Sequence, residues 1–185
     1  MTVRSKGFRK LPDGTVTCLL IDADSLVAIQ AKIGWDIDIE RLTDLVRTHY
    51  NTPRMVYFAT VDREPTEAAQ GFHGWLRYRG FELVLRPQSK HSGSHGRDGP
   101  GSGIPVEIAV EASMAPAACH HIILLSRNKE LEPVGTALRR SHRTMTLVSD
   151  ADCPRELRCS ATHFVDLTDM DTILMKQPRG EGVTR

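Results

Sequence analysis

Short apolar runs alternate with helix-periodic segments along most of this chain, and this alternation limits its fold more than any other feature. The first run, VTCLLID at residues 16–22, is almost entirely apolar and ends in Asp22. Such a run indicates a strand that is buried on both faces, because a half-exposed strand would alternate apolar and polar residues. The chain therefore predicts a sheet that is covered by helices on both sides.

The rest of the chain repeats this pattern in a regular order. Strands are expected at residues 16–22, 54–60, 81–86, 121–126, 143–149 and 163–167, and helices at 36–50, 64–79, 105–118, 129–141 and 154–160. Strand–helix–strand units in this order form right-handed crossovers and a parallel sheet. We therefore predict an α/β protein built as a three-layer α/β/α sandwich, with a central parallel sheet of about five to six strands.

A single domain accounts for the length of 185 residues. We expect an N-terminal extension at residues 1–15, the domain at 16–175 and a disordered polar tail at 176–185. Inside the domain, residues 87–103 read PQSKHSGSHGRDGPGSG and are rich in Gly, Ser and Pro. Long segments of this composition are typically functional or disordered, so a flexible loop is expected there.

Composition excludes some classes of protein. The chain has no apolar run long enough to span a bilayer, and its basic N-terminus lacks the apolar stretch of a secretory signal. We therefore expect a cytoplasmic protein with no membrane partner, whose four cysteines are free thiols. The net charge of +1 neither favours nor excludes nucleic acid.

Several motifs of common enzyme classes are absent from the sequence. There is no Walker loop, no GxGxxG after the first strand and no GxSxG. Nucleotide-binding doubly wound folds and serine hydrolases are therefore disfavoured. The cysteines and histidines also lack the short paired spacing that structural zinc sites favour.

Polar residues follow the predicted strands at their carboxyl ends, which is where parallel sheets bind ligands. Asp22 ends the first strand, and SRNKE at residues 126–130 follows the fourth. Glu107 and Glu111 are four residues apart and so share one helix face. Oxygen ligands of this kind suit Mg²⁺ or Mn²⁺, which can activate water against a phosphodiester. Alternatively the acidic residues cap helices or face solvent, although a carboxylate buried at Asp22 would need a partner.

Five segments, in this order, resemble those of the NYN domain family, the LabA-like branch of the PIN-like ribonuclease fold. They are CLLIDADSL (18–26), FATVD (58–62), GFHGWLRYRGFELVLRP (71–87), GIPVEIAVEA (103–112) and HIILLSRNKELEPVGTALRRSHRTMTLVS (121–149). The resemblance implies a PIN-like fold and metal-dependent cleavage of RNA.

The resemblance also implies that the acidic site is degenerate. Asp22 matches the family's first metal-binding Asp, whereas Ser25 stands where Asn is usual. Pro105 and Thr162 stand where Asp is expected, and Asn128 and Glu130 stand at the two Asp positions of the turn after the fourth strand. One carboxylate is thus kept in place, one is replaced by Glu, and Pro105, Asn128 and Thr162 leave three positions without one.

Two hypotheses remain open at this point. The first is a divergent Mg²⁺- or Mn²⁺-dependent endoribonuclease, and the second is a catalytically inactive module that holds RNA or a protein on the same fold. A homodimer is compatible with both. The first hypothesis assigns catalysis to Asp22, Glu107, Glu111 and Glu130, the metal to Asp22 and Glu130, and substrate binding to Ser25, Ser126, Asn128, Arg86 and Lys129.

Overall fold

Six parallel strands form the central sheet of the computed structural model, which describes residues 7–87, 103–170 and 175–178. Their spatial order is β4-β3-β1-β5-β6-β7. These strands are β1 (Val16–Asp22), β3 (Asn51–Val61), β4 (Phe81–Pro87), β5 (Cys119–Leu125), β6 (Thr144–Ser149) and β7 (His163–Asp166). Each neighbouring pair is parallel, so the predicted sheet is confirmed.

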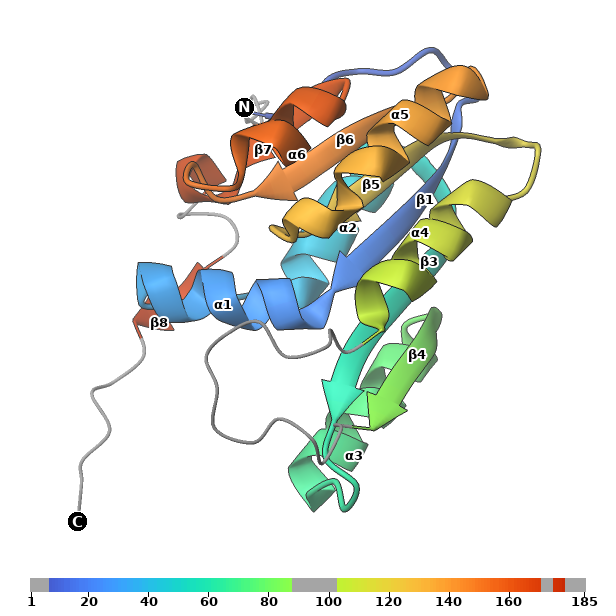
Figure 1. The fold of residues 1–185 in the computed structure, drawn as a ribbon. Helices are drawn as coiled ribbons and strands as arrows, with labels where there is room; N and C mark the ends of the chain where they lie inside the picture. The colour runs from blue at the N-terminus through green and yellow to red at the C-terminus, as the bar shows by residue number, and fades with distance from the viewer. Residues whose placement is uncertain (1–6, 88–102, 171–174, 179–185) are drawn as a thin grey trace.

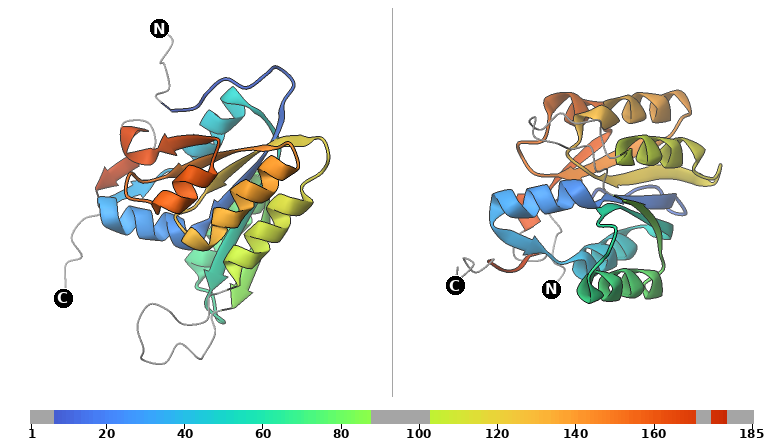
Figure 2. Two further views of the ribbon diagram at one scale, coloured as in Figure 1. Left: turned by 45° about the horizontal axis from the view of Figure 1, so that its top comes forward. Right: turned by 60° about the horizontal axis from the view of Figure 1, so that its bottom comes forward.

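Helices cover both faces of this sheet (Figures 1 and 2). They are α1 (Ala23–Ile33), α2 (Ile39–His49), α3 (Glu67–Tyr78), α4 (Ile104–Met114), α5 (Glu132–Arg140) and α6 (Arg155–Ser160), with short 3-10 helices η1 (Lys129–Leu131) and η2 (Leu167–Met170). Buried residues of α1, α2 and α3 share one core cluster, and those of α4, α5 and α6 share the other. The predicted three-layer α/β/α sandwich is therefore confirmed.

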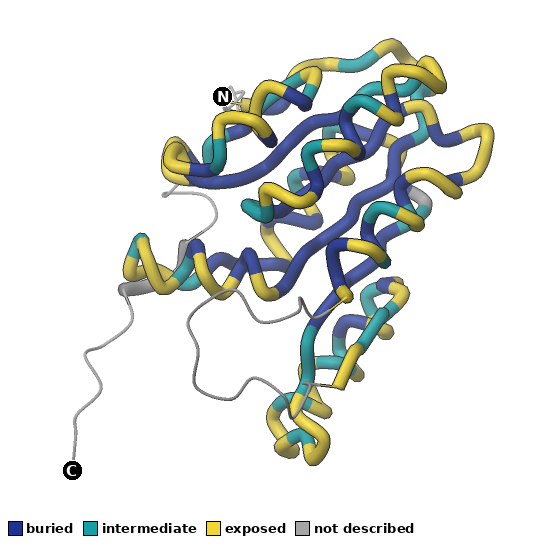
Figure 3. The backbone as a smooth tube through the Cα atoms, viewed as in Figure 1, coloured by how far each residue is buried: buried dark blue, intermediate teal, exposed yellow. Residues whose placement is uncertain are grey.

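The apolar first run lies in the middle of the sheet, between β3 and β5. All its residues from Thr17 to Asp22 are buried (Figure 3). Leu19 and Ile21 pack into the core under α1–α3, and Cys18 and Leu20 pack into the core under α4–α6. A continuous apolar run is what a strand with two cores requires.

Helix α1 is an element that the pattern of apolar runs does not predict. Its end signals are nonetheless local: Asp22 is the N-cap, Asp24 lies in the first turn and Lys32 in the last. Gly34 ends the helix in the left-handed conformation at φ 73°. Because α1 begins directly at the end of β1, it holds the Asp22 carboxylate at a helix N-terminus.

Residues outside the predicted domain limits contact the domain at both ends. Phe8, in the predicted N-terminal extension, is only 7% exposed and packs edge-on against Tyr50, whose hydroxyl donates to the Arg9 carbonyl at 2.6 Å. At the other end, Met175–Pro178 form β8, which pairs antiparallel with β2 (Trp35–Ile37). Backbone pairing thus orders the start of a segment whose polar composition predicts disorder.

Two predicted flexible regions fall mostly outside the described residues. Of the predicted loop at 87–103, Pro87 ends β4 and Gly103 caps α4, while residues 88–102 are not described. Residues 179–185 of the predicted tail are likewise not described. Among the residues that are described, no helix is both long and apolar enough to cross a membrane. The four cysteines are free thiols, as expected.

Candidate functional site

The candidate site lies where the strand order reverses, between the carboxyl ends of β1 and β5. From β1 the chain proceeds to β3 and β4 on one side, and it later places β5, β6 and β7 on the other side. Asp22 is the last residue of β1, and Ser126 directly follows β5. Reversal points of this kind form a crevice in parallel sheets, and they are the usual place for a ligand.

Two serine hydroxyls hold the Asp22 carboxylate. Ser25 donates to it twice, from its backbone N–H to Oδ1 at 3.2 Å and from its hydroxyl to Oδ2 at 2.6 Å. The Ser126 hydroxyl donates to the same Oδ2 at 2.7 Å. In turn, the hydroxyls of Ser25 and Ser126 accept from the backbone N–H groups of Arg127 and Asn128, both at 3.0 Å. The carboxylate is thus the final acceptor of a short network that joins β1 to β5.

Burial sets the protonation behaviour of Asp22, which is 2% exposed. Loss of solvent raises the pKa of its carboxyl above the usual value, and the negative charge of Asp24 raises the pKa further. The hydrogen bonds from Ser25 and Ser126 lower the pKa, but they only partly offset the effect of burial. The ionised form of Asp22 is therefore less favourable here than in water.

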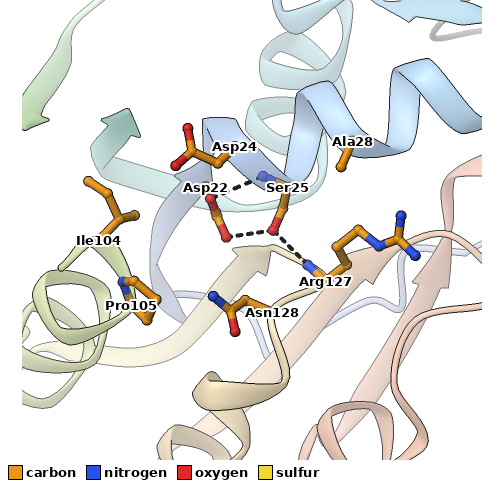
Figure 4. Close-up of a pocket in the computed structure, with 8 residues that line it drawn as sticks. All are labelled: Asp22, Asp24, Ser25, Ala28, Ile104, Pro105, Arg127 and Asn128. Atoms are coloured by element: carbon orange, nitrogen blue, oxygen red, sulfur yellow. Dashed lines mark hydrogen bonds between the residues drawn. The ribbon is translucent and has the colours of Figure 1, made fainter. Parts of the chain in front are cut away.

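A pocket of about 250 Å³ opens above this network (Figure 4). We call it the Asp22 pocket; it is lined by Asp22, Asp24, Ser25, Ala28, Ile104, Pro105, Arg127 and Asn128. Asp24, on the first turn of α1, is exposed, and its carboxylate accepts from the Thr60 hydroxyl at 2.7 Å. Ile104 and Pro105, at the start of α4, give the pocket an apolar wall. The pocket thus combines two carboxylates, an amide and a cation.

Cations lie close to this pocket. Arg127 lines it, and its Nε lies 3.8 Å from Oδ1 of Asp150, a residue that directly follows β6 and is 1% exposed. Lys32 of α1 contacts the carboxylates of Asp150 at 2.6 Å and Asp152 at 2.5 Å. These contacts raise the pKa of Lys32 and keep its ammonium charged. The carboxyl edge of the sheet therefore carries its own positive charges beside its acidic residues.

The other predicted catalytic carboxylates do not join Asp22. Glu107 pairs with Arg86 of β4, and Glu111 pairs with Arg54 at 2.7 Å. Arg54 lies beside Cys18, well before the end of β1, so Glu111 is far along the sheet from Asp22. Glu130 instead lines a groove between α4 and α5. The four-residue spacing correctly puts Glu107 and Glu111 on one helix face. That face forms salt bridges with Arg86 and Arg54 of the sheet and does not point to Asp22.

Some of the predicted substrate-binding residues lie around Asp22, and the others lie elsewhere. Ser25, Ser126 and Asn128 come together around Asp22, and the Asn128 side chain accepts from the Glu130 N–H at 2.9 Å. Arg86 is held by Glu107, and Lys129 lines a separate cavity beside Glu132. Pro105, which the resemblance placed at a site position, lines the Asp22 pocket. Thr162, also at such a position, instead accepts from the Met145 N–H near the start of β6, at the end of the sheet away from Asp22.

Three pocket features were not among the predicted site residues: Asp24, Arg127 and the apolar wall at Ile104. Asp24 and Arg127 each lie two residues beyond a strand end, so the rule that found Asp22 could have included them. Ile104 gives no such signal, because an apolar residue at a helix start is indistinguishable from core until strand order is known. The role of Lys32 also gives no sequence signal, because its partner Asp150 is 118 residues away in the sequence.

The donor set fits a divalent metal ion poorly. Asp22 is engaged by three hydrogen bonds, and the Asp24 carboxylate is engaged by Thr60. In the described parts of the chain, no three His, Cys, Asp or Glu side chains group closely enough to hold a metal. Arg127 lines the same pocket and would oppose a second cation. The expectation of Mg²⁺ or Mn²⁺ stays a prediction that the described residues do little to support.

Comparisons with known proteins agree with this architecture. Residues 16–169 match the model of the NYN domain. The chain is 25% identical over 170 residues to the low amplitude and bright protein LabA of Synechococcus elongatus, which covers 88% of this chain and 89% of that protein. A solved structure of a Vibrio parahaemolyticus protein of unknown function superimposes with a TM-score of 0.69 at 17% identity, covering 91% of this chain and all of that one. The chain belongs to the NYN domain family and has its PIN-like α/β/α fold.

Proposed function

We propose that this NYN domain binds single-stranded RNA at the Asp22 pocket without cleaving it. One observation carries the proposal: the carboxylate in the family's first metal-binding position is already engaged by Ser25 and Ser126. A carboxylate held in this way and raised in pKa is a structural acceptor rather than an open metal ligand. Metal-assisted hydrolysis needs the opposite arrangement, in which several ionised oxygens converge on one point.

The composition of the pocket supports a nucleotide as its occupant. The Arg127 guanidinium offers charge to a phosphate, and its 3.8 Å contact with Asp150 is long enough to be exchanged. The side-chain NH2 of Asn128 can donate to a ribose hydroxyl or a base edge, and the Asp24 carboxylate keeps acceptor capacity beyond its contact with Thr60. Pro105 offers an apolar surface. A volume of about 250 Å³ accommodates one nucleotide unit rather than a folded RNA.

The test is the binding of an end-labelled single-stranded RNA, measured by fluorescence anisotropy over a range of salt. We expect affinity that falls with salt, and about tenfold weaker binding for Arg127→Gln, which removes a charged phosphate contact. The matched control is Arg77→Gln, which removes the same charge from an exposed site on α3 and should change affinity little. Equal loss in both variants, or no binding at low salt, would contradict the proposal.

A further inference from the structure

Helix α4 is apolar on both its inner and its outer side, while Glu107 and Glu111 form a polar strip along one flank. Ile104, Ile108 and Ala112 are buried against the sheet. On the outer side, Val106, Val110 and Met114 recur every four residues and are 66%, 48% and 75% exposed. A contiguous exposed apolar surface of this kind marks an interaction site on a soluble protein. The outer stripe therefore indicates a surface that becomes covered when the protein assembles.

This stripe borders a groove of about 750 Å³ between α4 and α5, which lie side by side on one face of the molecule (Figure 1). Pro133 and Ala137 of α5 form the opposite wall. The only ionisable side chain among the described residues of the lining is Glu130. We name this surface, formed by the outer stripe and the groove beside it, the α4–α5 face.

Charge is distributed unevenly along the α4–α5 face. Both helices run from the carboxyl edge of the sheet to its amino edge, because each precedes a parallel strand. Glu130 lies at the beginning of the groove. Arg140 lies at its end, seven residues after Pro133 on the same side of α5. Arg143 marks that end too, since its guanidinium donates to the Ala115 carbonyl just beyond α4 at 2.9 Å.

We propose that the α4–α5 face is the interface of a homodimer in which a second copy of the chain packs antiparallel about a two-fold axis. The outer stripe of each α4 then lies against the groove of the other copy. The antiparallel arrangement places Glu130 of each chain at the Arg140 end of its neighbour. Neither of these side chains has an ion-pair partner within the described residues, so the two new pairs displace no existing contact.

A second copy fits this face better than an unrelated partner, because the face is complementary to itself. It contains both a ridge and a groove, and both an acidic and a basic end, in the order that a two-fold axis requires. Its apolar centre is also typical of homodimer interfaces, which are more apolar than those of transient complexes. The inference concerns assembly and is independent of whether the Asp22 pocket binds RNA.

The oligomeric state is tested by light scattering coupled to size-exclusion chromatography, over a range of protein concentrations. We expect twice the chain mass of 20.6 kDa at the upper end of that range. Val110→Glu should leave only monomer, because it places two charges at the centre of the interface. Val27→Glu is the matched control: Val27 is similarly exposed, at 54%, but lies on α1, so its dimer should persist.

Charge reversal tests the antiparallel arrangement itself. Glu130→Arg alone and Arg140→Glu alone each create two like-charge pairs, and each should weaken the dimer about tenfold or more. An equimolar mixture of the two variants should recover the dimer, because a heterodimer contains two opposite-charge pairs. Monomer at every concentration of the wild type, or no recovery in the mixture, would overturn the proposal.

Discussion

At the scale of single residues, the properties of the candidate site depend on the side chains that surround Asp22. The sequence predicts a buried carboxylate at the end of the first strand, and this residue is 2% exposed in the structure. Its partners could be predicted only as residues at strand ends. Ser126 is separated from Asp22 by 104 residues, and the two meet because β1 and β5 are neighbours in the sheet. Sequence pattern predicts strands well, but it does not fix which of them are adjacent.

Asp22→Asn is expected to stabilise the protein at neutral pH. Because burial raises the pKa of Asp22 in the folded state, ionisation of this carboxyl opposes folding. That penalty is absent below the ordinary Asp pKa of about 3.9 and is complete once the pH exceeds the raised value. The amide of Asn can still accept from Ser25 and can donate to Ser126. We expect a gain of about 1 kcal/mol at pH 8, seen as a rise of about 2–4 °C in Tm.

The measurement is thermal unfolding of both proteins by circular dichroism between pH 4 and pH 8, a range chosen around the ordinary Asp pKa of about 3.9. The difference between the two Tm values should grow with pH. A variant that is less stable than wild type at pH 8 would show that the two serines outweigh burial and that the carboxylate is stabilised in its ionised form.

At the scale of elements, side-chain direction explains what the sequence could and could not show. The spacing of Glu107 and Glu111 predicts a shared helix face, and α4 confirms that expectation. Their direction depends on Arg86 and Arg54, which belong to β4 and β3. Helix α1 was missed for a different reason. Its capping residues Asp22 and Gly34 are visible in the sequence, but the helix has no long apolar stripe of its own beside the strong strand pattern of residues 16–22. Local signals predict elements, and contacts between elements require the assembled sheet.

The contact between α5 and α6 gives a sharp test at this scale. A Cβ at Gly135 would lie 2.3 Å from the Ser160 carbonyl oxygen, a backbone atom that cannot move aside cheaply. Gly135→Ala should therefore lower the free energy of unfolding by about 1–3 kcal/mol. Gly74→Ala is the matched control in α3, where nothing lies within 4 Å of the added methyl, and it should stabilise by about 0.5–1 kcal/mol.

Urea unfolding followed by circular dichroism at 222 nm, the helical band, compares the two variants, with an expected m-value of about 1–3 kcal/mol/M for the wild type. Similar effects of the two alanines would show that α5 and α6 are less closely packed than the described contacts require.

At the scale of the whole molecule, the order of strands and helices was enough to predict the α/β/α sandwich, because each crossover is right-handed and local in sequence. The ends of the domain were harder to predict. Phe8 lies in a polar segment yet packs into the core, and β8 is ordered by backbone pairing with β2. A single buried ring and a short backbone pairing leave almost no periodic signal.

The whole molecule also carries the argument for binding without catalysis that we propose, because the chain keeps the NYN architecture while its predicted catalytic residues are dispersed. Asp22 stays at the reversal point of the strand order, but Glu107, Glu111 and Glu130 lie against other partners or in another groove. The fold therefore brings two carboxylates and an arginine to one pocket, and no group of three or more potential metal ligands forms among the described residues.

Cleavage of an end-labelled single-stranded RNA in the presence of Mn²⁺, followed on a denaturing gel, tests this distinction most directly. Wild type and Asp22→Asn are compared at concentrations where the RNA is bound. A binding site without catalysis predicts intact RNA with both proteins. Mn²⁺-dependent fragments that appear with the wild type and vanish with Asp22→Asn would contradict it, and would show that Asp22 is a working catalytic carboxylate.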